Sequence, residues 1–134
     1  MLWETSAVLN DLHTFESKDS SYVALQGYQG RVTVNVRVDS MAIDELPESG
    51  GAPTPEQRKT FVRHNIDAIR AIVEKKLEQG DAEPEDWHGR PVLGVQILDT
   101  DLAEYMSHPG NRLSYAAFDL RAQSRWVGRD GRFA

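Results

Sequence analysis

The sequence predicts a single α+β domain in which a small antiparallel sheet of three to five strands packs against one long amphipathic helix. The chain has 134 residues, a length that suits one domain with one hydrophobic core. Residues 31–39 alternate polar and valine side chains, the pattern of a strand with one buried face. Residues 55–79 repeat apolar side chains at helical spacing. Because the strand and the helix each have one apolar face, we expect these faces to pack together.

The strand at 31–39 is predicted to be the second half of a β-hairpin. The run before it, 21–26, is also rich in residues that favour strands. Gly27 and Gly30 enclose two residues between the runs, and glycine tolerates the positive φ angles of hairpin turns. We therefore place the hairpin loop at residues 27–30.

The predicted helix has clear start and stop signals. Thr54 suits the N-cap, Pro55 suits the first helical position, and Gln57 completes a capping-box spacing with Thr54. Gly80 follows the last predicted helical residue and suits a C-terminal stop. These signals predict one continuous helix over 55–79.

The remaining segments carry weaker local patterns. In chain order we expect a short helical turn at 41–46, an acidic loop at 81–91, a strand at 92–98, a short helix at 99–106 and a strand at 112–120. Residues 1–19 and 121–134 receive no assignment. No internal repeat divides the chain, so we treat 1–134 as one domain with 121–134 as a basic C-terminal arm.

Two polar residues, Asn65 and Lys76, fall on the apolar side of the predicted helix. They are eleven residues apart, which separates them by about 16 Å along a helix axis, so they do not share one small ligand. We expect the Lys76 stem to lie on apolar surface with its ammonium reaching water or terminal carbonyls. We expect a buried Asn65 to hydrogen-bond to a nearby loop or strand. A binding role for either residue stays open.

The order of these features resembles a family of short bacterial proteins of unknown function. The likeness rests on the hairpin, on the helix pattern F-x3-N-x3-I-x2-I-x3-K-x3-G over 61–80, and on an apolar run that leads to Asp101 and Leu102. It covers residues 20–102 and implies a small antiparallel sheet with one long helix. It implies no activity. The chain departs from the family in its acidic insertion around 81–90 and in its added segment from 103 onward.

One motif points to catalysis. Asp99 and Asp101 follow an apolar run as D-x-D, which resembles the nucleophile motif of haloacid-dehalogenase-type phosphatases and implies Mg²⁺-dependent phosphoryl transfer. Ala103 stands where that family has Thr or Val, and little chain follows for its large sheet. The competing interpretation, which we favour, is helix capping by Asp99 and favourable helix-dipole contacts of Asp101 and Glu104.

No other pattern indicates a metal, a cofactor or a nucleophile. The four histidines lack metal-ligand spacing, and the absence of cysteine excludes thiolate chemistry and disulfides. Nucleotide-binding and serine-hydrolase motifs are absent as well. We therefore expect no cofactor and no metal site.

Charge is distributed unevenly along the chain. Residues 1–109 hold 10 Lys and Arg against 19 Asp and Glu, a net charge of −9, whereas residues 110–134 have a net charge of +3. The arm at 121–134 mixes arginines with aromatic residues, which suits either nucleic acid or an acidic protein surface. The overall charge of −6 disfavours nucleic acid. We predict that the arm docks on protein through Arg121, Arg125, Trp126, Arg129, Arg132 and Phe133.

These observations favour a non-catalytic interaction or regulatory module that self-associates into a homo-oligomer. The alternatives are a small Mg²⁺-dependent phosphoryl-transfer enzyme using Asp99 and Asp101, and a weak nucleic-acid binder that uses the C-terminal arginines. No apolar run reaches the roughly 20 residues of a membrane span, and the N-terminal residues lack the features of a secretory signal. We therefore expect a cytoplasmic protein without membrane contact.

Overall fold

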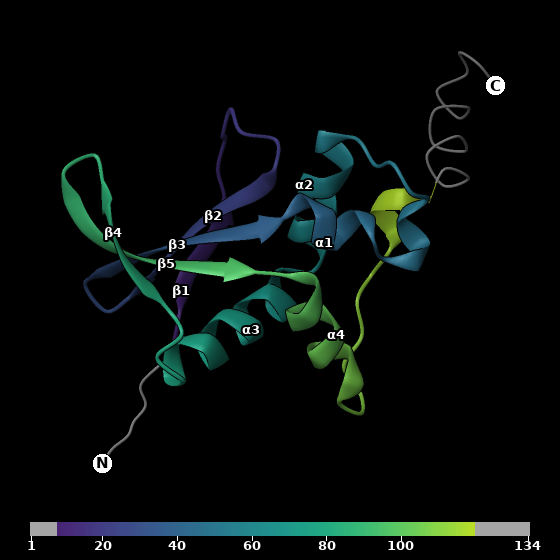
Figure 1. The fold of residues 1–134 in the computed structure, drawn as a ribbon. Helices are drawn as coiled ribbons and strands as arrows, with labels where there is room; N and C mark the ends of the chain where they lie inside the picture. The colour runs from purple at the N-terminus through teal and green to yellow at the C-terminus, as the bar shows by residue number, and fades with distance from the viewer. Residues whose placement is uncertain (1–7, 120–134) are drawn as a thin grey trace.

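The computed structural model describes residues 8–119, which fold into strands and helices around one core (Figure 1). The strands are β1 (Asn10–Thr14), β2 (Tyr22–Gln29), β3 (Val32–Asp39), β4 (Glu83–Trp87) and β5 (Arg90–Ile97). The α-helices are α1 (Ser40–Asp44), α2 (Pro55–His64), α3 (Ile66–Glu78) and α4 (Asp99–Ser107), with 3₁₀ turns η1 (Pro47–Ser49) and η2 (Ala116–Phe118). The predicted α+β class is confirmed.

The strands form one five-stranded sheet in the order β1-β2-β3-β5-β4. Neighbouring strands run antiparallel except β3 and β5, which pair in parallel with Val36 opposite Val95. The sheet is therefore mixed, and the expectation of a purely antiparallel sheet is corrected at this one pair. The parallel pair arises because the chain crosses from β3 through three helices before β5 joins the sheet, a connection that parallel neighbours require.

The predicted hairpin is present, but its turn lies two residues later than expected. Gln29 pairs with Val32, which leaves Gly30 and Arg31 as the turn, and Gly30 has a φ of 62°. Gly27 instead lies within β2 and is buried. A Cβ at position 27 would approach the side chains of Leu9 and Leu12 to 3.2 Å. The glycine is thus explained by packing against residues near β1, not by turn geometry.

Residues 83–87, which we expected in an acidic loop, form strand β4 at one edge of the sheet. His88 and Gly89 make its two-residue turn to β5, with φ angles of 54° and 80°. Both residues in the left-handed region are typical of a type I′ hairpin turn. Pro84 and the acidic side chains are uncommon in strands, so the sequence pattern did not predict β4. Both features suit an edge strand, where they discourage pairing with other chains.

The predicted helix begins and ends where expected but is not continuous. The Thr54–Gln57 capping box is confirmed by two hydrogen bonds, of 3.1 Å from the Gln57 N–H and 2.8 Å from the Thr54 N–H. Gly80 follows the helix with a φ of 73°. Between these ends, Asn65 has a φ of −112° and a ψ of 28°, which interrupts the helix and separates α2 from α3.

Asn65 is a structural residue that clamps the segment after α4. It is 6% exposed. Its side-chain Nδ2 donates to the carbonyls of Phe61 at 2.8 Å and Ser114 at 2.9 Å, and its Oδ1 accepts from the Ser114 N–H at 2.7 Å. The amide therefore satisfies both backbone groups of Ser114, as a neighbouring strand would. This accounts for its position on the apolar side of the helix.

The segment after the clamp is irregular, so the predicted strand at 112–120 is wrong for the described part, which ends at residue 119. Its only regular element is the short turn η2. Aromatic stacking holds the segment against α2, with the Phe61 ring centroid 5.2 Å from that of Phe118 and 6.2 Å from that of Tyr115. Side-chain packing and the Asn65 clamp thus replace sheet pairing here.

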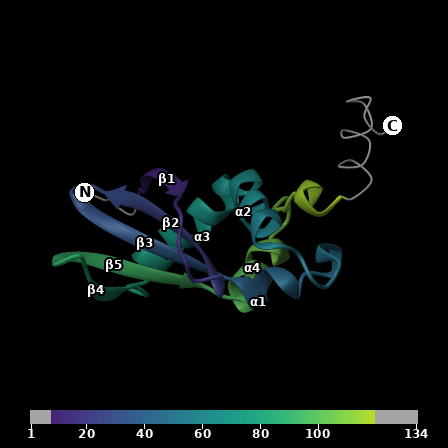
Figure 2. The same ribbon diagram turned by 90° about the horizontal axis from the view of Figure 1, so that it is seen from above.

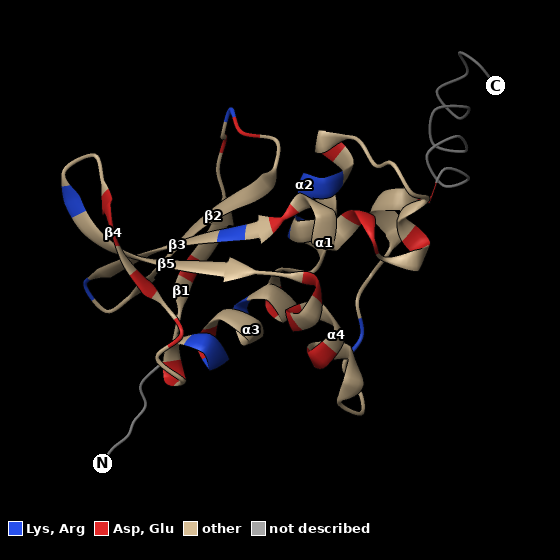
Figure 3. Cartoon of the chain, in the orientation of Figure 1, with Lys and Arg blue, Asp and Glu red and all other residues tan. Residues whose placement is uncertain are grey.

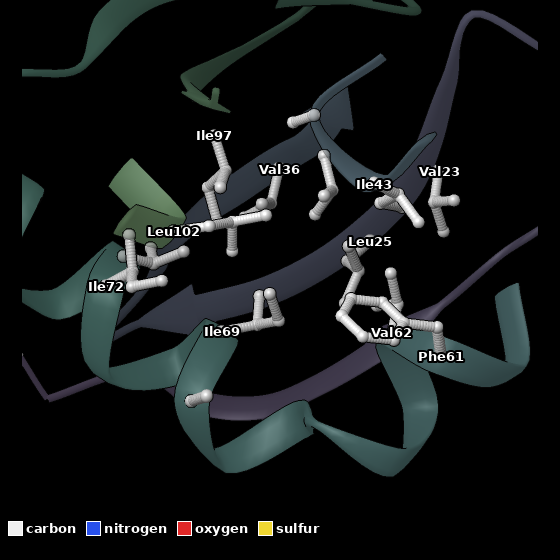
Figure 4. Close-up of a cluster of buried hydrophobic side chains, with 14 of the residues drawn as sticks. Val23, Leu25, Val36, Ile43, Phe61, Val62, Ile69, Ile72, Ile97 and Leu102 are labelled. Carbon is white, nitrogen blue, oxygen red and sulfur yellow. The ribbon is translucent and has the colours of Figure 1, made fainter. Parts of the chain in front are cut away.

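The core lies between one face of the sheet and the helices (Figure 4). All four α-helices contribute buried side chains to it, among them Ile43, Phe61, Ile69 and Leu102. Helices α1, α2 and α4 gather at one end of the sheet (Figure 2). No helix within residues 8–119 is long and apolar enough to cross a membrane. The opposite face of the sheet carries the alternate, mainly polar side chains of β2 and β3.

Candidate functional site

A groove of about 410 Å³ lies between α3 and α4. Ala71, Ile72 and Tyr105 contribute apolar surface to it. Its charged residues are Lys75, Lys76, Asp81, Asp101 and Glu104, and Gln79, His108 and Asn111 complete the lining. The groove contains both the lysine and the D-x-D aspartate that the sequence singled out for separate reasons.

Lys76 and Asp101, which both line this groove, form an ion pair. The Lys76 Nζ lies 3.1 Å from the Asp101 Oδ1 and 3.2 Å from the Asp81 Oδ2, and the lysine side chain is only 14% exposed. Lys75 pairs with Glu104 beside them. The fold brings these groups together because α4 starts directly after β5, next to the last turns of α3. The expectation that Lys76 reaches water or terminal carbonyls is thus replaced by two specific carboxylate partners.

Asp101, not Asp99, caps the start of α4. The Asp101 Oδ2 accepts a hydrogen bond of 2.8 Å from the Leu98 N–H, while its Oδ1 faces Lys76. Asp99 is exposed. The predicted capping role is therefore correct for the motif but assigned to the wrong residue. Both oxygens of Asp101 are engaged within the protein.

The same geometry bears on the magnesium interpretation of the D-x-D motif. A resident divalent cation needs several oxygen ligands that converge on one point. Within residues 8–119, no group of three or more His, Asp or Glu side chains is arranged to hold a metal ion. Asp101 is already neutralised by Lys76, so the motif serves the helix start and the groove's ion pair in this structure.

The two aspartates also determine the protonation of Lys76. Burial acts to lower the pKa of the ammonium, but the hydrogen bonds and charges of Asp101 and then Asp81 outweigh burial, so the pKa lies above its ordinary value. A lysine that acts as a nucleophile or base needs a lowered pKa. Lys76 is therefore a permanent cation at neutral pH, suited to holding carboxylates together.

Replacing Lys76 with Met should destabilise the protein by about 1–2 kcal/mol at pH 7, because Asp101 and Asp81 lose their partner in a partly buried groove. A raised folded-state pKa gives stability that is complete below the unfolded lysine pKa of about 10.4 and is lost as pH rises through the higher folded value. The difference between wild type and variant should thus be constant from pH 6 to 9 and shrink above about pH 10.5. Urea unfolding across this pH range measures it.

Lys75→Met is the matched control for this experiment. The Lys75 side chain is 47% exposed and its partner Glu104 is 57% exposed, so solvent screens the pair and its loss should have little effect on unfolding. A Lys76→Met difference that persists unchanged at pH 11 would contradict the assigned linkage.

The six residues predicted to bind a partner, Arg121 to Phe133 in the C-terminal arm, all lie outside the described residues. The described chain ends at Asp119, one residue after η2, and Figure 3 shows acidic residues on α1 and on the segment that follows it. Glu45 and Glu48 are exposed there. Burial raises the pKa of the Tyr115 hydroxyl, and the negative charge of Glu48 raises it further.

Sequence reasoning missed a second group of residues, on the uncovered face of the sheet. These are Asn35, Arg37, Glu85 and Trp87, which come from strands β3 and β4. Polar alternation in 31–39 marked that face as solvent-exposed, and β4 was not expected to be a strand. The sequence signal for this group is Gly94, because a glycine within a strand often marks the close approach of another group.

Comparison with known proteins adds no relative: no family model, curated protein or solved structure matches the chain. The geometry and charge of the chain itself therefore carry the functional argument.

Proposed function

We propose that this protein is a non-catalytic interaction module that self-associates by docking its basic arm, residues 121–134, on the acidic body of a second copy. The observation that carries the proposal is the excess of carboxylates on the body next to the point where the arm begins. The arm carries four arginines, Trp126 and Phe133, and its net charge is +3.

The body, residues 8–119, has fewer basic than acidic side chains, so its basic residues cannot neutralise all of its carboxylates. Residues 8–119 contain 11 Lys and Arg against 19 Asp and Glu, a net charge of −8. Six of these cations already form ion pairs within the body, namely Arg37, Arg58, Lys59, Arg70, Lys75 and Lys76. Carboxylates such as Glu45 and Glu48 thus remain exposed, and complementary charge would attract and orient the arginines.

The catalytic alternative gains no support from the groove. Asp101 and Lys76 engage each other, and within residues 8–119 Asp99 belongs to no group of three or more His, Asp or Glu side chains that could hold a metal. The nucleic-acid alternative faces the same excess of negative charge, which repels phosphates. The likeness to the short bacterial family is also a proposal; the order hairpin, helix, strand over residues 20–102 supports it.

Size-exclusion chromatography with light scattering tests the self-association. We expect the apparent mass to rise with protein concentration and to fall with added salt, because salt screens the contacts between arginines and carboxylates. Trp126→Ala should weaken assembly by about 30-fold or more, whereas Arg129→Ala should weaken it by less than about 5-fold. Buried aromatic residues usually carry most interface energy, and rim charges carry little.

Two results would overturn the proposal. One is a monomer at every concentration and ionic strength. The other is tight, salt-sensitive binding of DNA or RNA in a gel-shift assay that disappears when the arm's arginines are replaced, because this would assign the arm to phosphates.

A further inference from the structure

The uncovered face of the sheet contains a hollow of about 210 Å³ over β2, β3 and β4. Three aromatic side chains line it, Phe15, Tyr22 and Trp87, together with the polar residues Glu16, Ser17, Asn35 and Arg37. The helices of the described chain pack on the other face, so this hollow is separate from the groove between α3 and α4 (Figure 1).

Asn35 presents a buried donor that the described protein does not use. The residue is 6% exposed, and its Oδ1 accepts a hydrogen bond of 2.9 Å from the Gln26 Nε2 across the β2–β3 pair. Its Nδ2 carries two N–H groups, and neither donates a hydrogen bond to any of residues 8–119. Buried amide donors are rarely left without a partner, and an unsatisfied one costs about 1–3 kcal/mol. The unsatisfied amide of Asn35 therefore indicates that a ligand with a hydrogen-bond acceptor occupies the hollow.

Arg37 is held beside Asn35 by a bidentate ion pair. Its Nη1 and Nη2 both donate to the carboxylate of Glu85, and its guanidinium lies 6.0 Å from the centroid of the Tyr22 ring. A guanidinium has five N–H groups, so this pairing leaves donors in excess. Glu85 neutralises the charge and fixes the plane of the group, which makes Arg37 an oriented donor and not a mobile surface cation.

Gly94 makes this arrangement possible. It lies on β5 between Arg37 on β3 and Glu85 on β4, in register with Asn35 on one side and Glu83 on the other. A Cβ at position 94 would collide with the Glu85 carboxylate. The absence of a side chain therefore lets Glu85 cross the strand and reach Arg37, a close approach that only glycine permits.

We propose that the hollow binds one planar aromatic or heteroaromatic molecule that carries hydrogen-bond acceptors, such as a carboxylate or ring carbonyls. The flat ring would contact Phe15, Tyr22 and Trp87. Its acceptors would accept hydrogen bonds from the Nδ2 of Asn35 and from the remaining N–H groups of Arg37. The size is suitable, because an apolar cavity of about 150 Å³ binds benzene. Glu85 balances the charge of Arg37, and Lys59 balances that of Glu16, so the ligand is neutral or singly negative.

The chemistry of the hollow decides against the basic arm as its occupant. Asn35 and Arg37 offer donors, and arginine side chains offer only donors as well. Glu16, the carboxylate in the lining, is already paired with Lys59. The small-ligand site therefore stands independently of the self-association proposed above.

The test is an NMR titration of the full chain with three single-ring probes, following the Asn35 side-chain amide and the Trp87 indole N–H. Benzoate has a ring and an anionic acceptor, uracil has neutral carbonyl acceptors, and benzylamine has a cationic donor. We expect saturable shifts of both signals with benzoate or uracil and none with benzylamine. Asn35→Leu should weaken binding about tenfold, the equivalent of one hydrogen bond.

Two further variants keep the test decisive. Thr33→Val lies on the same strand and face but outside the hollow, and it should bind as wild type does. Trp87→Ala removes a ring wall without touching the donors, and it should also weaken binding; thermal melts check that each variant is folded. Equal binding of benzylamine, unchanged affinity in both Asn35→Leu and Trp87→Ala, or no saturable shift with any probe would overturn the proposal. Shifts of the same two signals caused by Trp126→Ala alone would overturn it too, by assigning the hollow to the arm.

Discussion

Replacing Ile69 with Glu should unfold the protein at room temperature or reduce its free energy of unfolding by about 4 kcal/mol or more. Ile69 lies in the first turn of α3, has no exposed surface and packs in the core between the helix and the sheet (Figure 4). A carboxylate there is buried with no cation beside it, which is one of the few changes that cost more than typical substitutions. Domains of this size have only about 5–15 kcal/mol of stability in total. Urea unfolding followed by circular dichroism measures the loss.

Ala71→Glu is the control, because it adds the same charge to the same helix two residues later. Ala71 is exposed and lines the groove that also contains Lys75 and Lys76, so the new carboxylate is hydrated and near cations. We expect a melting temperature close to that of wild type. A cooperative melt of Ile69→Glu at the wild-type temperature would contradict the packing of α3 on the sheet.

The features that the sequence predicted correctly are local. The hairpin follows from alternation in 31–39, and the helix limits follow from Thr54, Gln57 and Gly80, each of which acts on residues within one turn of itself. Such signals can be recognised in the sequence without knowing the rest of the fold.

The features that it missed depend on residues distant in the chain. The helix break at Asn65 is explained by Ser114, which is 49 positions away, and a single sequence gives no indication of that partner. The parallel pairing of β3 with β5 likewise depends on how the intervening helices pack. The sequence marked Lys76 and Asp101 as unusual but not as a pair, because their contact needs α4 beside α3.

Strand β4 was missed for another reason. Its acidic residues and Pro84 have low strand propensity, and the turn at His88 and Gly89 is a weaker sequence signal than Asn-Gly. At a sheet edge these residues are acceptable, because one side of the strand faces solvent. Missing β4 also concealed the Glu85–Arg37 pair, and with it the hollow on the uncovered face.

The two proposals use different parts of the molecule. Self-association uses the arm and the exposed acids near α1, whereas the small-ligand site uses the sheet face opposite the helices. Arg37 lines the hollow and is neutralised by Glu85, whereas Glu45 and Glu48 do not line the hollow. Removing these two exposed acids should therefore weaken assembly without changing binding of a ring compound. The experiments above can therefore succeed or fail separately.

Replacing Asn65 with Ala should lower the free energy of unfolding by about 2–3 kcal/mol and release the segment that follows α4. The substitution removes three hydrogen bonds and leaves the Ser114 N–H and carbonyl without their partner. Each buried group left unpaired costs about 1–3 kcal/mol. Alanine is a better helix former than asparagine, but this gain is below about 0.7 kcal/mol. The loss of the three hydrogen bonds is larger, so the net effect is a lower free energy of unfolding. The stacking of Phe118 and Tyr115 on Phe61 should loosen with the segment.

Hydrogen exchange separates this local release from general destabilisation. In Asn65→Ala the Ser114 amide should exchange with solvent much faster than the amides of β3, because its acceptor is gone while the sheet remains paired. His64→Ala is the matched control: His64 is exposed on the preceding turn, and its replacement offers a comparable helix-propensity gain without a lost clamp, so both stability and Ser114 protection should be kept. Wild-type protection of the Ser114 amide in Asn65→Ala would show that packing of Phe118 and Tyr115 alone holds the segment, and the role assigned to Asn65 would be wrong.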